Sequence, residues 1–198
     1  MHMDSVSYFN MMAEKWDDIV SHDEEKIKKI IDLLEIKEGS AILDIGTGTG
    51  VLVPFLHPYA GKSGTIIAID SAENMINIAK SKFDYRNVRF IVGDALTEEL
   101  PIKQFDYIIL YSVFPHLHDK RAAIRLLSEY LNKDGKMLIC HSQSREEINN
   151  MHKRIFGFNG NMILPEMSII ECYFNENRLE IVVKIDSNEM FVIIGQKN

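Results

Sequence analysis

Short, continuous apolar runs alternate along the chain with longer segments in which apolar residues recur at helical spacing. The apolar runs, which predict buried strands, cover residues 41–45, 65–69, 88–92, 105–111 and 136–140. Helices are expected from about residue 51, over residues 72–82 and 120–131, and from the capping box of Ser144 and Glu147 to about residue 156. Strands that alternate with helices in this way predict a parallel sheet with helices on both faces.

Two further helices are expected before the first strand, over residues 5–20 and 23–34. Ser21 and Glu24 are spaced as a capping box at the start of the second. Apolar residues at helical spacing then form one stripe, consisting of Ile27, Ile30, Ile31 and Leu34.

The C-terminus departs from the alternating pattern. Residues 179–185 and 190–194 are apolar runs separated by a short polar turn, which predicts a hairpin, so the sheet should end with an antiparallel strand. Residues 156–177 form one long insertion before it, in which Gly and Asn residues indicate a loop and Pro165 begins a short helix. The fold predicted is α/β, with an open, doubly wound, Rossmann-like sheet of about seven mostly parallel strands.

Length and composition narrow the classes of protein. The 198 residues, of which 46% are hydrophobic, fit one domain with a sizeable core. The two cysteines, Cys140 and Cys172, lack a CxxC spacing, which argues against a disulfide scaffold or zinc ribbon. Neither a signal peptide nor a membrane-spanning run is evident, so a cytoplasmic protein is expected. The net charge of −7 makes a nucleic-acid partner unlikely.

The most informative segment is a glycine-rich loop. Residues 43–50 read Leu-Asp-Ile-Gly-Thr-Gly-Thr-Gly and connect the first strand to its helix, where open α/β sheets bind ligands. The dinucleotide-binding fingerprint GxGxxG/A requires Gly or Ala at its last position. Counted from Gly46 that position is Val51, and counted from Gly48 it is Val53, so the fingerprint is absent. A phosphate-binding P-loop sequence is also absent. A glycine-rich turn that binds some other ligand remains an alternative.

The spacing Gly46-x-Gly48-x-Gly50, with Asp44 two residues before it, resembles the first motif of class I S-adenosylmethionine (SAM)-dependent methyltransferases. An acidic residue suits SAM, because SAM carries an ammonium and a sulfonium rather than a pyrophosphate. Asp70 ends the second strand, where a carboxylate can accept hydrogen bonds from both ribose hydroxyls.

Other segments extend the resemblance. Asp94, in a Gly-Asp-Ala sequence after the third strand, matches the acid that takes the adenine amino group in that family. Residues 105–111 resemble the fourth motif, and residues 131–136 resemble the turn before the fifth strand. Residues 9–17 (FNMMAEKWD) look like the N-terminal signature of the small-molecule group that includes quinone-ring methyltransferases. The resemblance covers roughly residues 14–141.

The resemblance implies a SAM site on the loops that follow the strands. The residues expected there are Asp44, Gly46, Thr47, Gly48, Gly50, Asp70, Ser71, Met75, Asp94, Ala95 and Tyr111. Ser71 is also expected to cap the helix after the second strand. Met75 is expected to pack on the adenine, with ordinary helix packing as the alternative.

Three histidines are expected near one rim of the sheet. His116 matches the second histidine of a His-His-Leu sequence common in the family, although Pro115 replaces the first. His141 directly follows the fifth strand, and His152 lies one helix further on. The three could be ordinary structural residues, or His116 or His141 could act as a general base or orient an acceptor oxygen. Together they could also hold a metal, although no local spacing supports this.

The acceptor side is expected to involve Tyr8, Trp16, His116, His141, Arg145 and His152, together with residues 156–177. The aromatic residues near the N-terminus could be core residues or could form a lid that excludes water. A sulfonium also favours nearby aromatic faces. Methyl transfer needs chiefly the alignment of the two reactants, so a side-chain nucleophile is not required.

The leading interpretation is a SAM-dependent methyltransferase that acts on a small-molecule acceptor by in-line displacement, with S-adenosylhomocysteine (SAH) as product and no metal requirement. It is one domain, residues 1–198, with N-terminal helices or a lid (1–38), a cofactor-binding core (39–142), and a substrate-side insertion and hairpin (143–198). Alternatives are an RNA or protein methyltransferase and a non-catalytic SAM-binding regulatory protein. The sequence leaves the acceptor and the oligomeric state open.

Overall fold

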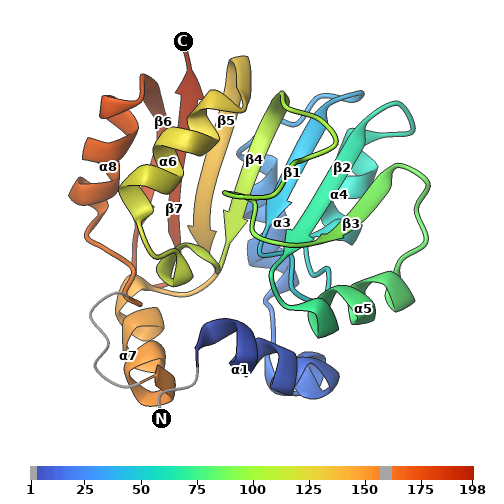
Figure 1. Cartoon of the computed structure of the whole chain (residues 1–198). Coiled ribbons are helices and arrows are strands. Elements are labelled where there is room, and N and C mark those ends of the chain that lie inside the picture. Colours follow the sequence, from blue (N-terminus) through green and yellow to red (C-terminus); the bar gives the residue numbers. More distant parts are fainter. Residues whose placement is uncertain (1–3, 157–161) are drawn as a thin grey trace.

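Seven strands form one sheet in the order β3-β2-β1-β4-β5-β7-β6 (Figure 1). The computed structural model describes residues 4–156 and 162–198. The strands are β1 (Ala41–Ile45), β2 (Thr65–Asp70), β3 (Val88–Val92), β4 (Phe105–Tyr111), β5 (Leu131–His141), β6 (Leu179–Asp186) and β7 (Phe191–Lys197). The predicted seven-stranded α/β fold is confirmed, and β1 to β5 pair in parallel.

The C-terminal hairpin supplies the antiparallel strand, but not at the edge of the sheet. β7 runs antiparallel to both β5 and β6 and lies between them, so β6 is the edge strand. Burial explains this order. Residues 191–195 of β7 are all buried, whereas every second residue of β6 is exposed. A run that is apolar on both faces needs neighbours on both sides, and a half-exposed strand suits an edge.

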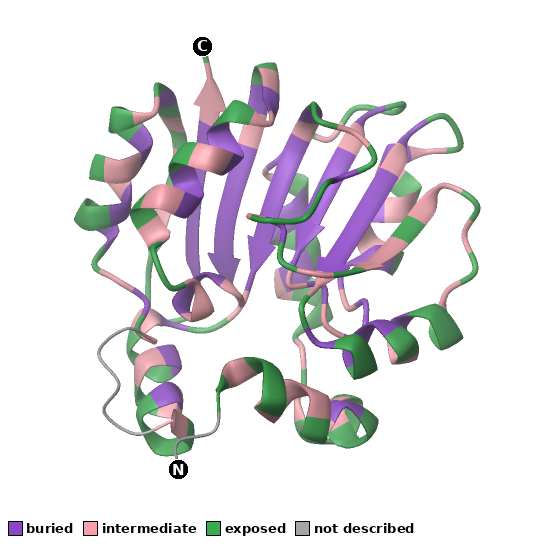
Figure 2. Ribbon diagram, in the orientation of Figure 1, coloured by how far each residue is buried: buried purple, intermediate pink, exposed green. Residues whose placement is uncertain are grey.

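Helices cover both faces of the sheet. They are α1 (Ser5–Met12), α2 (Trp16–Ile19), α3 (Glu24–Asp32), α4 (Val53–Ala60), α5 (Glu73–Lys82), α6 (Lys120–Glu129), α7 (Arg145–Phe156) and α8 (Met167–Glu176), with 3₁₀ turns η1 (Ala13–Lys15) and η2 (Phe114–His116). α6 and α8 pack on one face and α3 and α4 on the other. Figure 2 shows the strands as the buried layer between them.

Two predicted helix caps are wrong. Asp23, rather than the pair Ser21 and Glu24, caps α3, because its carboxylate accepts from the backbone N–H three residues further on. Ser71 does not cap α5: Ala72 is the N-cap residue, without a side-chain hydrogen bond. The hydroxyl of Ser71 instead donates to the backbone carbonyl that follows β3.

The N-terminal segment is broken rather than one continuous helix. α1, η1 and α2 follow one another, and α1 lies below the carboxyl ends of the central strands, close to α5 (Figure 1). The described part of the predicted insertion contains the regular helix α8, which packs on β6 and α6. Within the described residues, no helix combines the length and apolar character needed to cross a membrane.

Candidate functional site

A cavity of about 540 Å³ opens at the carboxyl ends of the central strands. Its wall includes the loop after β1, the ends of β2 and β4, residues 93–97, η2, α6 and part of the N-terminal segment. β1 lies between β2 and β4, so the chain leaves β1 and β4 toward opposite sides. Open α/β sheets place ligands at such a switch point.

The glycine loop is shaped so that its backbone faces the cavity. Gly46 has a φ of +67°, and a Cβ atom there would lie 2.4 Å from Cγ2 of Val113, so only glycine fits. Gly48 has a φ of +55°, and a Cβ atom there would meet nothing within 4 Å. The constraint at Gly48 is therefore conformational, and the space beside it is open to a ligand.

Two carboxylates hold this loop from different sides. Oδ2 of Asp70 accepts from the backbone N–H of Gly48 at 2.9 Å, and Oδ1 accepts from that of Ala72 at 2.8 Å. Asp44 lies behind the loop, only 1% exposed, and accepts from Oγ1 of Thr47 at 2.7 Å. Burial, with the charge of Asp70 as a lesser cause, raises the pKa of Asp44 to about 7. Asp44 is not on the cavity wall, so it can influence the cavity only through the loop and through its charge.

The other end of the cavity combines one carboxylate with apolar surfaces. Asp94 lies on the wall and accepts from the backbone N–H of Leu96 at 2.9 Å. Met75 and Ala95 also line this part of the wall and are nearly fully buried. Trp16 packs against Met75 from the N-terminal segment. This arrangement offers flat apolar contact beside a hydrogen-bond acceptor.

His22 is a wall residue that sequence reasoning missed. Its Nδ1 lies 3.0 Å from the hydroxyl of Tyr111, which is 2.9 Å from Oγ of Ser142. Burial raises the pKa of Tyr111 to about 12, so its hydroxyl stays neutral, and burial lowers the pKa of His22. His22 lies in a polar turn that matches no motif, so no local signal marked it.

The three predicted histidines do gather at one rim. The rings of His116 and His152 are 4.8 Å apart, and Nδ1 of His152 lies 2.8 Å from the carbonyl oxygen of Met162, to which it must donate. Within the described residues, Nδ1 of His116 and both ring nitrogens of His141 are buried without a hydrogen-bond partner. Burial, and then the neighbouring His152, lower the pKa of His116 and His141 to about 3. All of these rings are therefore neutral near pH 7.

The metal hypothesis gains no support from this geometry. Among residues 4–156 and 162–198, no group of three or more His, Cys, Asp or Glu side chains is placed to hold a metal ion. His116 lies on the cavity wall, whereas His141 and His152 lie behind it.

Comparison with known proteins decides the family. A family model described as "Methyltransferase domain" matches residues 36–175, which is most of the chain. The chain belongs to this methyltransferase family. Its fold is that of a SAM-dependent methyltransferase from Aquifex aeolicus, with a TM-score of 0.72 at 18% identity, over 99% of this chain and 100% of that one.

The alignments with curated relatives cover only part of each chain. A demethylmenaquinone methyltransferase of Staphylococcus saprophyticus is 29% identical over 143 residues, which are 69% of this chain and 61% of that protein. One from Staphylococcus aureus (strain Newman) is 27% identical over 165 residues, 79% of this chain and 67% of that protein. A third, from Staphylococcus carnosus (strain TM300), is 28% identical over 138 residues, and the alignment spans 57% of its length. The chain thus spans about three fifths of the Staphylococcus saprophyticus and Staphylococcus carnosus proteins.

The methyltransferase domain brings many, but not all, of the predicted site residues to the cavity. On the wall are Trp16, Gly46, Thr47, Gly48, Asp70, Ser71, Met75, Asp94, Ala95, Tyr111 and His116. Not on the described wall are Tyr8, Asp44, Gly50, His141, Arg145 and His152. Tyr8 instead packs edge-on against the rings of Phe9 and Phe156. Of residues 156–177, those numbered 157–161 lie outside the described residues, and none of the others is on the wall.

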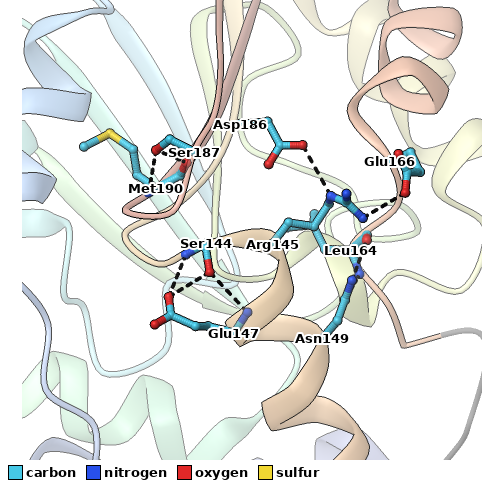
Figure 3. Close-up of polar contacts among 9 residues, drawn as sticks. All are labelled: Ser144, Arg145, Glu147, Asn149, Leu164, Glu166, Asp186, Ser187 and Met190. Carbon is cyan, nitrogen blue, oxygen red and sulfur yellow. Dashed lines mark hydrogen bonds and ion pairs between the residues drawn. The ribbon is translucent and has the colours of Figure 1, made fainter.

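Arg145 is engaged away from the cavity, at the start of α7 (Figure 3). Its guanidinium pairs with Glu166 at 3.1 Å and with Asp186 at 3.3 Å. The predicted capping box beside it is confirmed: Ser144 donates its backbone N–H to Glu147 at 3.0 Å, and Glu147 donates its own to Oγ of Ser144 at 3.2 Å. Arg145 thus anchors α7 to the segment before α8 and to the end of β6.

Replacing the buried His141 with leucine should reduce the loss of stability that the protein undergoes as the pH falls. Above pH 6.5 the imidazole is neutral in both states, but below it the unfolded chain takes up a proton that folded His141, with a pKa of about 3, does not. The loss of unfolding free energy between pH 7 and pH 5 should therefore be smaller by about 2 kcal/mol in His141→Leu. Urea unfolding at both pH values measures this.

Cys140→Ala provides the control and should leave that pH dependence as in the parent protein, since it alters the buried neighbour of His141 in β5 without removing a group that titrates between pH 5 and pH 7. An equal loss of stability in His141→Leu and the parent chain would contradict the assignment of His141 as a neutral buried group.

Proposed function

We propose that this methyltransferase domain binds SAM in the cavity and transfers its methyl group to a small-molecule acceptor. The observation that carries the proposal is the placement of carboxylates along the cavity. Asp70 and Asp94 lie on the wall, and Asp44 lies behind the glycine loop. A pyrophosphate would be repelled there, whereas a ligand with an ammonium, a sulfonium and hydroxyl groups would be favoured.

The described residues fit the parts of SAM. Asp70 has lone pairs left after its two backbone hydrogen bonds, so it can accept from ribose hydroxyls. Asp94 is the proposed acceptor for the adenine amino group, and Met75 and Ala95, which also line the wall, supply apolar surface. The charge of Asp44 favours the ammonium end at the glycine loop. SAM, when bound, supplies a methyl group on a sulfonium, a group that an acceptor can displace in line.

Size supports a small acceptor. The cavity of about 540 Å³ falls within the range of small-molecule sites. The staphylococcal relatives are named for a small molecule, demethylmenaquinone, which supports the same class of acceptor here. Val6, Phe9 and Leu117 give the remaining wall an apolar character.

His116 is the candidate for positioning the acceptor. It lies on the wall, between Phe9 at 5.1 Å and His152 at 4.8 Å, as measured between ring centroids. With a pKa of about 3 it binds a proton weakly, so it is better suited to orient an acceptor group by a hydrogen bond than to store its proton. His141 lies behind it and supports the cluster from β5. Alignment of this kind lowers the barrier of a displacement reaction.

Calorimetry with SAM and SAH tests the cofactor assignment. Both should bind, and Asp70→Asn should weaken binding about 10- to 100-fold, because it loses a charged acceptor for the ribose hydroxyls. Asp84→Asn is the control, since Asp84 is exposed and lies off the cavity wall. Failure of both ligands to bind the parent protein would overturn the proposal. Binding without transfer to any small-molecule acceptor would favour a non-catalytic role.

The affinity for SAM should rise with pH between about 6 and 8. Asp44 has a pKa of about 7 in the free protein, and only its ionised form attracts the ammonium, so affinity falls up to tenfold per pH unit below that value. Calorimetry at several pH values measures the slope. Asp44→Asn should remove it, and methylthioadenosine, which lacks the amino-acid part of SAM, should not show it. A slope of the same size for methylthioadenosine would refute this role of Asp44.

A further inference from the structure

The N-terminal segment crosses the cofactor half of the cavity as a strap, which comprises α1, η1 and α2. Its first attachment is to α5. Oδ1 of Asn10 accepts from the backbone N–H of Asn74 at 2.9 Å, and Nδ2 of Asn74 donates to the backbone carbonyl of Asn10 at 3.0 Å. The two hydrogen bonds fix the strap at the first turn of α5.

The second attachment is a single carboxylate that reaches two other elements. Oδ1 of Asp17 accepts from Oγ1 of Thr49 at 2.5 Å, and Oδ2 lies 2.7 Å from Nζ of Lys82. Thr49 belongs to the glycine loop and lines the cavity, and Lys82 ends α5. Asp17 therefore ties the strap to the loop that is proposed to hold the cofactor.

The underside of the strap faces the cavity. Phe9 and Trp16 pack edge-to-face at 5.3 Å, and both lie on the cavity wall. Ala13, between them in the sequence, is buried in a small apolar cluster with Met75. Met11, by contrast, is 61% exposed. The residues that face inward recur at helical spacing, which accounts for the pattern of residues 9–17.

We propose that Asp17 is a positioning residue that latches the strap over the bound cofactor and so sets the rate at which the cofactor leaves. The inference rests on the proposed function, because it takes SAM and SAH as the ligands. A ligand between the glycine loop and the rings of Phe9 and Trp16 leaves when the strap lifts. Lifting the strap breaks the contacts of Asp17 with Thr49 and Lys82.

The dissociation rate of SAH tests the latch directly. Trp16 is the chain's single tryptophan and lies on the cavity wall, so its fluorescence should change when SAH binds. Stopped-flow mixing with a series of SAH concentrations, followed at Trp16, gives the dissociation rate as the intercept of the observed rate at zero SAH. Asp17→Asn should raise it about tenfold, since a charge-assisted hydrogen bond and an ion pair are weakened.

Asp18→Asn is the matched control. It removes the same charge from the next position of the same helix, where the side chain makes no hydrogen bond or ion pair with the described residues, and it should change the rate less than about twofold. Equal rates in the two variants would overturn the latch. So would a Trp16 signal that does not respond to SAH when calorimetry shows that SAH is bound.

Variants at Thr49 separate a latch from a general loss of structure. Thr49→Ser keeps the hydroxyl and should preserve the rate of the parent protein, whereas Thr49→Val should raise it. The effects of Thr49→Val and Asp17→Asn should be less than additive, because both weaken the hydrogen bond between these two side chains. Fully additive effects would contradict the proposed pair. Absence of SAH binding to the parent protein would overturn the proposed function itself, and the role of the strap with it.

Discussion

The carboxylate of Asp70 is the interaction on which the rest of the site depends. One oxygen holds the glycine loop at Gly48 and the other holds the start of α5 at Ala72, so a single side chain fixes two segments that follow different strands. Burial raises the pKa of Asp70, and the two backbone N–H groups oppose that rise. The same carboxylate stays on the cavity wall, where it can serve a ligand. The same carboxylate thus stabilises the local structure and is proposed to bind the ligand.

The two parts of the cavity that are proposed to bind the cofactor and the acceptor differ in their charged groups. Asp70 and Asp94 line the proposed cofactor part, and Asp44 is buried deeply enough that its charge depends on pH near 7. The proposed acceptor part has His116, whose ring lies beside other neutral imidazole and aromatic rings. A positively charged sulfonium between them would face carboxylates on one side and uncharged rings on the other. Such a division suits a reaction in which the positive charge of the sulfonium disappears.

Much of this could be predicted from sequence because it is local. The strands are apolar runs bounded by turns, and in a parallel sheet the residues after each strand must meet at one edge, which brought Asp70 and Asp94 to one cavity. The pairing of His22 with Tyr111 spans 89 positions and leaves no local trace. The start of α3 shows a further limit. Ser21 and Asp23 are both good N-cap residues, and only the exact position of the first helical residue selects between them.

Some residues were assigned to the right helix or strand from sequence, but their partners are set by the tertiary structure. Arg145 does begin α7, but Glu166 and Asp186 arrive from distant segments and engage its guanidinium. β7 is buried over residues 191–195, and only the completed sheet shows that it lies between β5 and β6. Local pattern therefore predicts where an element lies in the chain, whereas its partners depend on the fold.

Unequal burial among the N-terminal helices bears on which of them can move. α3 buries Ile27, Ile30 and Ile31 against the sheet, whereas α1 has no buried residue. Within the strap only Ala13 is fully buried. A segment with so little buried apolar area belongs to the least stable part of a fold. The proposed opening of the strap at Asp17 would therefore cost far less than any displacement of α3. Because Asp70 holds the glycine loop at Gly48 independently of Asp17, the loop would keep that attachment when the strap lifts.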